Sequence, residues 1–287
     1  MQLTAITDEI SQDFEHALDV LAEYGARAAE LRGLWNVNIA DLTREDVRRA
    51  KRALSERAMR VACLATPFFK CDLDDAAPAV AGRMHLARPR GMDEQMAMLR
   101  RCCELAHAFD TDLIRVFTFW RRDAYTPDIE DRIVAAFDEP LRLAEREQVT
   151  LALENEHACY VGTGAETARV LERLPSPNLR ACWDPGNAYS AGETPYPDGY
   201  EAVRARVAHV HIKDGVMQPE GEGPRWCVVG EGDIDYPGHF AALARDGYAG
   251  FISLETHYIP AGGTPEDGSR PCLAALRRLI EANQPNA

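Results

Sequence analysis

The sequence predicts an α/β fold, a single (β/α)8 TIM barrel in which eight parallel strands alternate with eight helices. Short β-branched or apolar runs alternate along the whole chain with longer segments of helical period. A doubly wound open sheet would favour a GxGxxG phosphate turn after an early strand, and none follows a strand here. The 287 residues suit one barrel, so we expect a single domain spanning residues 1–287.

Eight segments are expected to be strands, because each is short and rich in β-branched or apolar side chains. They are residues 3–7, 28–31, 61–65, 113–117, 150–154, 180–184, 207–212 and 251–255. Helices are expected near residues 13–24, 43–57, 92–109, 128–148, 165–174, 197–205, 236–246 and 270–282. Two long connections, residues 66–91 and 213–235, follow the third and seventh strands, at the end where barrels build active sites.

The charge and cysteine content exclude several classes of protein. There are 32 Lys and Arg residues against 46 Asp and Glu residues, a formal net charge of −14. This balance argues against binding to nucleic acid or to an anionic membrane, because both need clustered basic side chains. No apolar run reaches the roughly 18 residues of a membrane span, and the N-terminus lacks a basic signal region. The eight cysteines form no CxxC pair, so a reducing cytoplasm is expected.

Four successive strands end on a polar side chain where the barrel interior should be. By the period of two, the apolar face of strands five to eight packs on the helices and the other face points to the axis. The inward side chains at these ends are Glu154, Asp184, His211 and Glu255. Ionised carboxylates are costly to bury, so three of them need a compensating cation. One divalent metal ion is expected, with Mn²⁺, Mg²⁺ or Co²⁺ favoured over Zn²⁺ by the oxygen-rich ligands.

Five stretches carry a resemblance to a known family. They are Leu153-Glu154-Asn155-Glu156, Trp183-Asp184-Pro185-Gly186-Asn187, His209-Val210-His211-Ile212-Lys213-Asp214, Gly230-Glu231-Gly232-Asp233-Ile234-Asp235 and Ser253-Leu254-Glu255. In order and spacing they resemble the xylose-isomerase-like TIM-barrel superfamily of sugar (phosphate) isomerases and epimerases, across nearly the whole chain. The resemblance implies that Glu154, Asp184, His211 and Glu255 hold the metal. It also implies that Glu154 and Glu255 are the catalytic acid/base pair.

One departure from the resemblance bears on the reaction. The tagatose-epimerase-like members have a His three residues after the metal Asp, where this chain has Asn187. The Asp-Pro-Gly-Asn form resembles broader isomerase and keto-sugar dehydratase members, and His-x-Lys-Asp recurs in inosose-dehydratase-like members. A ketose 3-epimerase is therefore less favoured than the wider class.

Six further residues near the strand ends are candidates for substrate binding: Arg115, Glu156, Asn187, His209, Lys213 and His257. Each also has an ordinary structural interpretation. Arg115 could form a salt bridge in the barrel core with Glu30, and His209 could be a packed, hydrogen-bonded neighbour of the site. Lys213 could simply pair with Asp214 or Asp233.

These observations predict a metal-dependent isomerase or epimerase that acts on a small keto-sugar or polyol. A proton next to a carbonyl would be removed to give a metal-stabilised enediolate. A keto-sugar dehydratase of the inosose type is the alternative on the same site. An apurinic endonuclease and a non-catalytic subunit are more remote alternatives. The expected partner is a small molecule, with no nucleic acid and no membrane, and a homo-oligomer is left open.

Overall fold

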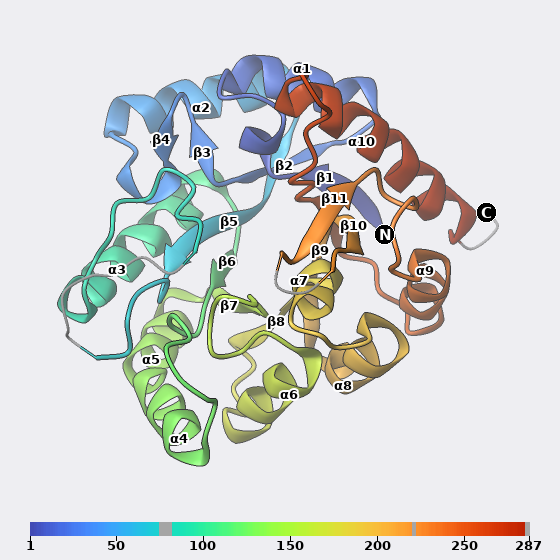
Figure 1. Ribbon diagram of the computed structural model, residues 1–287. Coiled ribbons are helices and arrows are strands. Elements are labelled where there is room, and N and C mark those ends of the chain that lie inside the picture. The colour runs from blue at the N-terminus through green and yellow to red at the C-terminus, as the bar shows by residue number, and fades with distance from the viewer. Residues whose placement is uncertain (75–81, 220–221, 285–287) are drawn as a thin grey trace.

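Eight parallel strands curl into a barrel at the centre of the molecule (Figure 1). The computed structural model describes residues 1–74, 82–219 and 222–284. The strand order is β1-β12-β9-β8-β7-β6-β5-β2. A parallel bridge between Ile6 and Glu30 joins the β1 and β2 edges, so the barrel is nearly closed. The predicted fold class is confirmed.

The barrel strands follow the predicted segments closely. They are β1 (Gln2–Ala5), β2 (Ala28–Leu31), β5 (Arg60–Phe68), β6 (Leu113–Val116), β7 (Thr150–Glu154), β8 (Leu179–Trp183), β9 (Val207–Ile212) and β12 (Phe251–Leu254). Two short antiparallel pairs lie outside the barrel, β3 (Gly33–Leu34) with β4 (Val37–Asn38), and β10 (Asp214–Met217) with β11 (Pro224–Cys227). The second pair gives the long connection after β9 an ordered structure over the mouth of the barrel (Figure 1).

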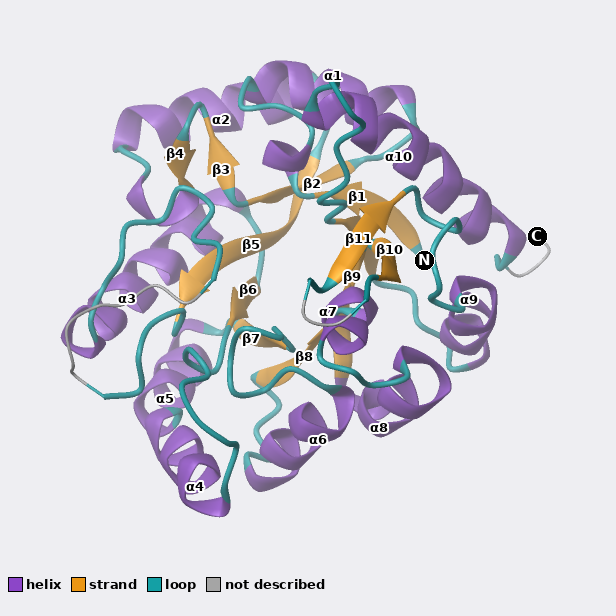
Figure 2. Ribbon diagram, in the orientation of Figure 1, coloured by secondary structure: helices purple, strands orange, loops and turns teal. Residues whose placement is uncertain are grey.

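Helices surround the barrel (Figure 2). They are α1 (Phe14–Glu23), α2 (Arg44–Glu56), α3 (Met92–Phe109), α4 (Pro127–Ala136), α5 (Asp138–Glu147), α6 (Gly164–Arg173), α7 (Pro185–Ser190), α8 (Tyr200–Val203), α9 (Tyr236–Arg245) and α10 (Pro265–Ala282). Single turns of other helical types occur at Thr7–Glu9, Ile39–Asp41, Pro195–Gly199 and Arg204–Arg206. Within the described residues, no helix has both the length and the apolar character needed to cross a membrane.

Three predicted helices differ from the observed ones for identifiable reasons. The segment 128–148 forms two helices that meet at Phe137, because Pro140 cannot donate a hydrogen bond to the carbonyl of Ala136. The segment 197–205 is helical mainly in the short α8, since prolines and Gly199 disfavour a longer helix. Helix α10 begins at Pro265, earlier than expected, because Thr264 and Asp267 form a capping box there.

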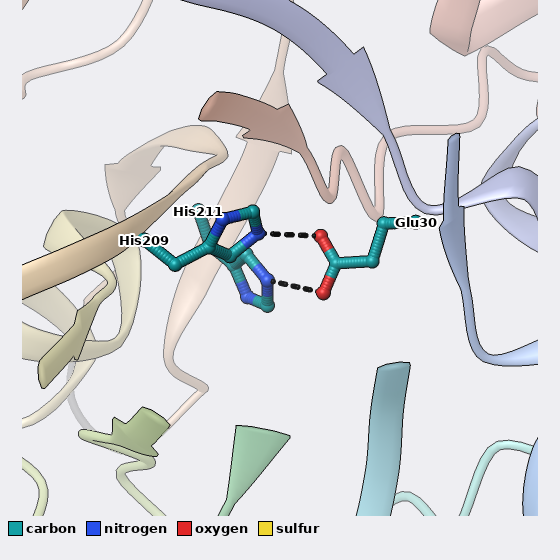
Figure 3. Close-up of side chains that lie close together, drawn as sticks. All are labelled: Glu30, His209 and His211. Carbon is teal, nitrogen blue, oxygen red and sulfur yellow. Dashed lines mark hydrogen bonds and ion pairs between the residues drawn. The ribbon is translucent and has the colours of Figure 1, made fainter. Parts of the chain in front are cut away.

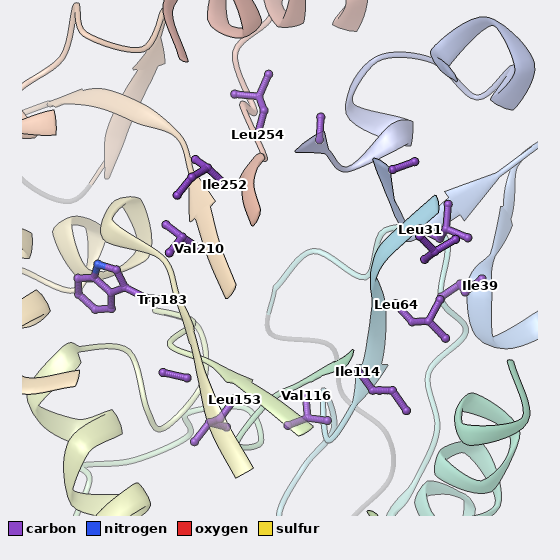
Figure 4. Packing of buried hydrophobic residues seen from close by; sticks show 14 of the residues in the cluster. Leu31, Ile39, Leu64, Ile114, Val116, Leu153, Trp183, Val210, Ile252 and Leu254 are labelled. Atoms are coloured by element: carbon purple, nitrogen blue, oxygen red, sulfur yellow. The ribbon is translucent and has the colours of Figure 1, made fainter. Parts of the chain in front are cut away.

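The strands divide their side chains between two environments, as the period of two predicts. Leu153, Val210 and Leu254 belong to the large cluster that packs between the strands and the surrounding helices (Figure 4). Cys63, Ala152 and Cys182 form a separate small cluster among the side chains of the opposite parity. At the C-terminal ends of the strands, the residues that point into the barrel are polar.

Candidate functional site

Four polar side chains from four strands meet at the C-terminal end of the barrel. One ligand-type atom from each of Glu154, Asp184, His211 and Glu255 lies within 4.8 Å of the other three. All four residues are buried, with at most 3 % of their surface exposed. Metal–ligand distances of about 2.1 Å place opposite ligands about 4.2 Å apart, so this spacing suits a single ion. The cluster could therefore hold a metal ion.

Asn187 ties two of these carboxylates together. Asp184 is the N-cap of α7, and its Oδ1 accepts a hydrogen bond from the Asn187 backbone N–H at 2.8 Å. The Asn187 side-chain amide donates to Glu154 Oε1 at 3.2 Å. Pro185 suits the first helical position because its missing N–H would have no partner there. The Asp-Pro-Gly-Asn stretch thus orients Asp184 and Glu154 through one short helix.

Three buried cations contact the same carboxylates. Lys213 Nζ lies 2.5 Å from Asp184 Oδ2 and 2.9 Å from Glu255 Oε2. The Arg32 guanidinium donates to Glu255 Oε1 at 2.7 Å. The Arg115 guanidinium lies 3.2 Å from Glu154 Oε2 and 3.9 Å from Glu255 Oε1.

These surroundings shift the pKa values of Asp184 and Glu255, the two carboxyl groups that Lys213 bridges, in opposite directions. Burial raises the pKa of Asp184 to about 6, although the charge of Lys213 opposes this. Burial also acts to raise the pKa of Glu255, but the charges of Lys213 and its other neighbours outweigh burial and hold the pKa well below its usual value. Of these two carboxyl groups, Glu255 is the one whose ionised form is favoured.

Negative charge exceeds positive charge in this part of the barrel. Arg32 is shared, because it also forms ion pairs with Asp8 and Glu9. The connected group contains six carboxylates and three fixed cations: Asp8, Glu9, Glu30, Glu154, Asp184 and Glu255 against Arg32, Arg115 and Lys213. Glu154 Oε2 is buried and accepts no hydrogen bond. Excess buried negative charge of this kind calls for a cation or protons.

Glu30 on β2 connects the cluster to a second histidine. Its Oε1 lies 3.0 Å from His211 Nε2 and its Oε2 lies 2.8 Å from His209 Nε2 (Figure 3). All three side chains are fully buried. The other ring nitrogen of His211, Nδ1, lies 3.1 Å from Glu154 Oε1. Nε2 of His211 therefore faces Glu30, while Nδ1 faces Glu154 in the four-residue cluster.

Two cavities of about 270 Å³ each lie at the mouth, and His85 and His257 line both of them. The two imidazoles stack with ring centroids 5.8 Å apart. One cavity is lined by residues that include Glu156, His157, Asn187 and Trp226, and the other by residues that include Asp8, Glu9 and Arg32. A larger cavity of about 640 Å³ lies at the opposite end of the barrel, among the N-terminal ends of strands. The four cluster residues do not line these mouth cavities themselves, but Arg32 and Asn187 do, and they contact Glu255 and Glu154. The mouth cavities are therefore the candidate substrate space.

The six predicted substrate-binding residues fall into two groups. Glu156, Asn187 and His257 line a mouth cavity. The other three residues, Arg115, His209 and Lys213, are buried around the cluster. Arg115 and Lys213 contact carboxylates of the cluster, whereas His209 contacts Glu30. Glu156 is paired with Lys70 at 3.1 Å and with His157 at 3.0 Å.

Several residues that surround the site were not anticipated as part of it. Glu30 lies on β2 and Arg32 follows its last residue with the same parity, so the period of two could have indicated both. Lys70 and His85 lie in the long connection after β5, where no periodicity places a side chain. His85 and His257 both have a left-handed backbone, with φ of 45° and 50°, which is uncommon for residues other than glycine.

Comparisons with known proteins agree with this architecture. A family model described as a xylose isomerase-like TIM barrel matches residues 18–279. An inosose dehydratase of Lacticaseibacillus casei is 25% identical over 159 residues, which cover 49% of this chain and 51% of that protein. The chain therefore spans about half the length of the first curated relatives that it matches.

Solved structures share the fold at low sequence identity. The probable 3-DHS dehydratase from Bacillus anthracis superposes with a TM-score of 0.74 at 18% identity, covering 96% of this chain and 98% of that one. The D-allulose 3-epimerase from Methylomonas sp. gives a TM-score of 0.72 at 17% identity, covering 97% and 96%. At such identities the likeness bears on the fold rather than on the reaction.

Proposed function

The chain belongs to the xylose isomerase-like TIM-barrel family, and we propose that it is a divalent-metal-dependent isomerase or epimerase of a small keto-sugar or polyol. The observation that carries the proposal is the convergence of Glu154, Asp184, His211 and Glu255 within 4.8 Å at the barrel mouth. Carboxylates on facing strands can also exchange a proton with a substrate that lies between them.

The residues present fit a metal ion. Glu154, Asp184, His211 and Glu255 would hold it, and they offer three carboxylates and one imidazole. Such a set suits Mn²⁺, Mg²⁺ or Co²⁺ and suits Zn²⁺ less well. The excess of buried carboxylates over cations supports a cationic occupant, and so does Glu154 Oε2, which is ion-paired with Arg115 but accepts no hydrogen bond.

Glu154 and Glu255 would carry out the proton transfers. When bound, the ion would polarise the substrate carbonyl and lower the cost of negative charge on oxygen. One of the two glutamates takes the proton from the carbon next to the carbonyl, and the electron pair of the C–H bond moves towards the carbonyl to give an enediolate. Return of a proton to the opposite face of that carbon gives epimerisation, whereas return to the neighbouring carbon gives isomerisation.

The other polar residues would bind and orient the substrate. Glu156, Asn187 and His257 line the mouth cavity, where they can contact hydroxyl groups. The Lys213 ammonium and the Arg115 guanidinium lie beside the carboxylates, where positive charge would stabilise an oxyanion. His209 reaches the site only through Glu30.

A keto-sugar dehydratase is a second candidate, favoured by the match to inosose dehydratases. Its first step is the same removal of a proton next to a carbonyl. The hydroxyl on the following carbon then leaves as water after it receives a proton, and a double bond forms. The difference between the candidates lies in the fate of the enediolate.

Proton exchange with solvent tests the shared step. Purified protein loaded with Mn²⁺ is incubated in D₂O with ketoses, inososes and keto-glycosides, and deuterium next to the carbonyl is followed by NMR. Glu154→Gln and Glu255→Gln are each expected to lower the exchange rate by about 10²- to 10⁴-fold, the usual contribution of a positioned acid or base. Exchange that persists at the wild-type rate in both variants would refute the assignment.

A matched control is Glu130→Gln. Glu130 pairs with Arg169 at 3.0 Å on the outer helices and lines neither mouth cavity, so the same chemical change is made outside the site. This variant is expected to exchange at the wild-type rate. The products separate the two candidates, since a dehydratase releases water and forms an unsaturated ketone, whereas an isomerase or epimerase conserves the substrate mass.

A further inference from the structure

Glu30 lies outside the four-residue cluster but contacts it through His211. The carboxylate stands on β2 and both imidazoles stand on β9, across the barrel interior (Figure 3). Its two oxygens are divided between two different rings, at 3.0 Å from His211 Nε2 and at 2.8 Å from His209 Nε2. None of the three side chains is exposed, so water does not compete for these contacts.

The position of Glu30 determines which nitrogen of His211 a metal ion could bind. A carboxylate at 3.0 Å requires Nε2 of His211 to carry a hydrogen, because two acceptors would repel each other at that distance. By the same argument Nδ1, which lies 3.1 Å from Glu154 Oε1 inside the cluster, carries a hydrogen when no metal is bound. A metal ion would replace that hydrogen on Nδ1, while Glu30 keeps the hydrogen on Nε2. Carboxylates that fix the tautomer and the ring orientation of a metal-binding histidine are a recurrent feature of metal sites.

His209 has the complementary role of holding the carboxylate. It occupies the second oxygen of Glu30, which prevents the carboxylate from turning away from His211. Its own Nδ1 is buried and has no hydrogen-bond partner, so its polar contact is with Glu30. The two histidines are alternate residues of one strand with ring centroids 5.2 Å apart, which fits a rigid pair on one carboxylate.

We propose that Glu30 is a positioning residue, which together with His209 holds His211 so that Nδ1 is presented to a divalent metal ion. This inference rests on the proposed metal-dependent function, and it concerns the affinity and geometry of the site rather than the reaction. Glu30 itself is not a ligand in this arrangement. The sequence alone links Glu30 to neither histidine, because 179 residues separate it from His209.

Metal binding to Glu30→Gln is the direct test. The substitution keeps the length of the side chain but replaces one acceptor by an NH₂ donor, so the two histidines can no longer both donate to residue 30. After treatment with EDTA and dialysis, Mn²⁺ is titrated and free Mn²⁺ is measured by EPR. We expect one Mn²⁺ per chain in both proteins and a Kd about 10- to 100-fold higher in the variant, the usual effect of losing such a partner.

A second variant keeps the inference testable if Glu30→Gln does not fold. His209→Phe leaves the bond between Glu30 and His211 but releases the other oxygen, and we expect Kd to rise by a smaller factor, about 3- to 10-fold. Glu193→Gln serves as the control for general loss of stability, because Glu193 caps α6 by accepting from the backbone of Gly164 and Ala165. Its Mn²⁺ affinity is expected to equal that of the wild type.

The visible spectrum of the Co²⁺-loaded protein separates positioning of His211 from a general contribution to folding, because loss of stability alone would leave the spectrum of the folded protein unchanged. The intensity and position of the bands are expected to change in Glu30→Gln, because they report the ligand geometry. Unchanged Kd and spectrum in a folded Glu30→Gln variant would overturn the inference, and so would an unchanged Kd in His209→Phe. A wild-type stoichiometry of two ions that falls to one in Glu30→Gln would also overturn it, since Glu30 would then be a ligand. A wild-type protein that binds no divalent ion would instead refute the proposed function.

Discussion

Replacing Lys213 by Met should destabilise the metal-free protein and make its stability depend strongly on divalent metal. The ammonium bridges Asp184 and Glu255 at 2.5 and 2.9 Å, and the residue is 1 % exposed. Methionine has a similar length and no charge, so the substitution leaves little empty space. The two carboxylates would lose the cation that they share.

The distances set the size of the effect. At an effective dielectric constant of about 20, each contact contributes about 6 kcal/mol of gross Coulomb attraction. Most of this is offset by the cost of desolvating the lysine, so loss of one partner from a buried ion pair typically destabilises by about 3–5 kcal/mol. A metal ion that binds the same carboxylates would supply the missing charge. Mn²⁺ at 100 times its Kd adds about 2.7 kcal/mol through binding alone.

Urea unfolding at neutral pH, with EDTA or with Mn²⁺, measures both effects. In EDTA, we expect the free energy of unfolding of the Lys213→Met variant to be about 3–5 kcal/mol lower than that of the wild type. Addition of Mn²⁺ is expected to raise the free energy of unfolding more in the variant than in the wild type. Equal stability of the variant and the wild type in EDTA would refute the role of the ammonium as a shared counter-ion. An equal response of both proteins to Mn²⁺ would refute the idea that lysine and metal neutralise the same carboxylates.

Three further outcomes are expected. Burial lowers the pKa of His239 from the usual 6.5 to about 3. The neutral imidazole therefore stabilises the fold above pH 6.5, and this stabilisation is lost as the pH falls towards 3. Chemical unfolding should show that the free energy of unfolding of the wild type, relative to His239→Phe, falls by about 2 kcal/mol between pH 8 and pH 5. Gly268→Ala would push a Cβ into the carbonyl of Tyr258 and should cost about 1–3 kcal/mol in the same assay, whereas wild-type stability would contradict the packing of α10 against the loop after β12. Asn187→Ala removes the amide that donates to Glu154 Oε1 and should slow proton exchange in D₂O about 10- to 100-fold in a folded protein, and an unchanged rate would show that this bond does not matter.

The local patterns of the sequence determined the barrel and the inward direction of the four strand ends. A period of two is a property of the extended backbone itself, so Ala152 and Glu154, or His209 and His211, share a face whatever surrounds them. Eight strand-and-helix units then imply closure, and closure brings the ends of β7, β8, β9 and β12 together. Helix boundaries were less certain, because Pro140 broke one expected helix and a capping box extended another.

Only the tertiary structure decided which residues are partners. Arg115 had Glu30 as an expected partner, yet its guanidinium lies against Glu154 and Glu255, while Glu30 holds the two histidines. Arg32 reaches Glu255 across 223 residues of sequence, and Lys213 lies between two carboxylates from different strands. Such pairings depend on the relative rotation of neighbouring strands and on side-chain rotamers in a crowded interior. They follow from closing the barrel, and the alternation of residues along a single strand does not contain them.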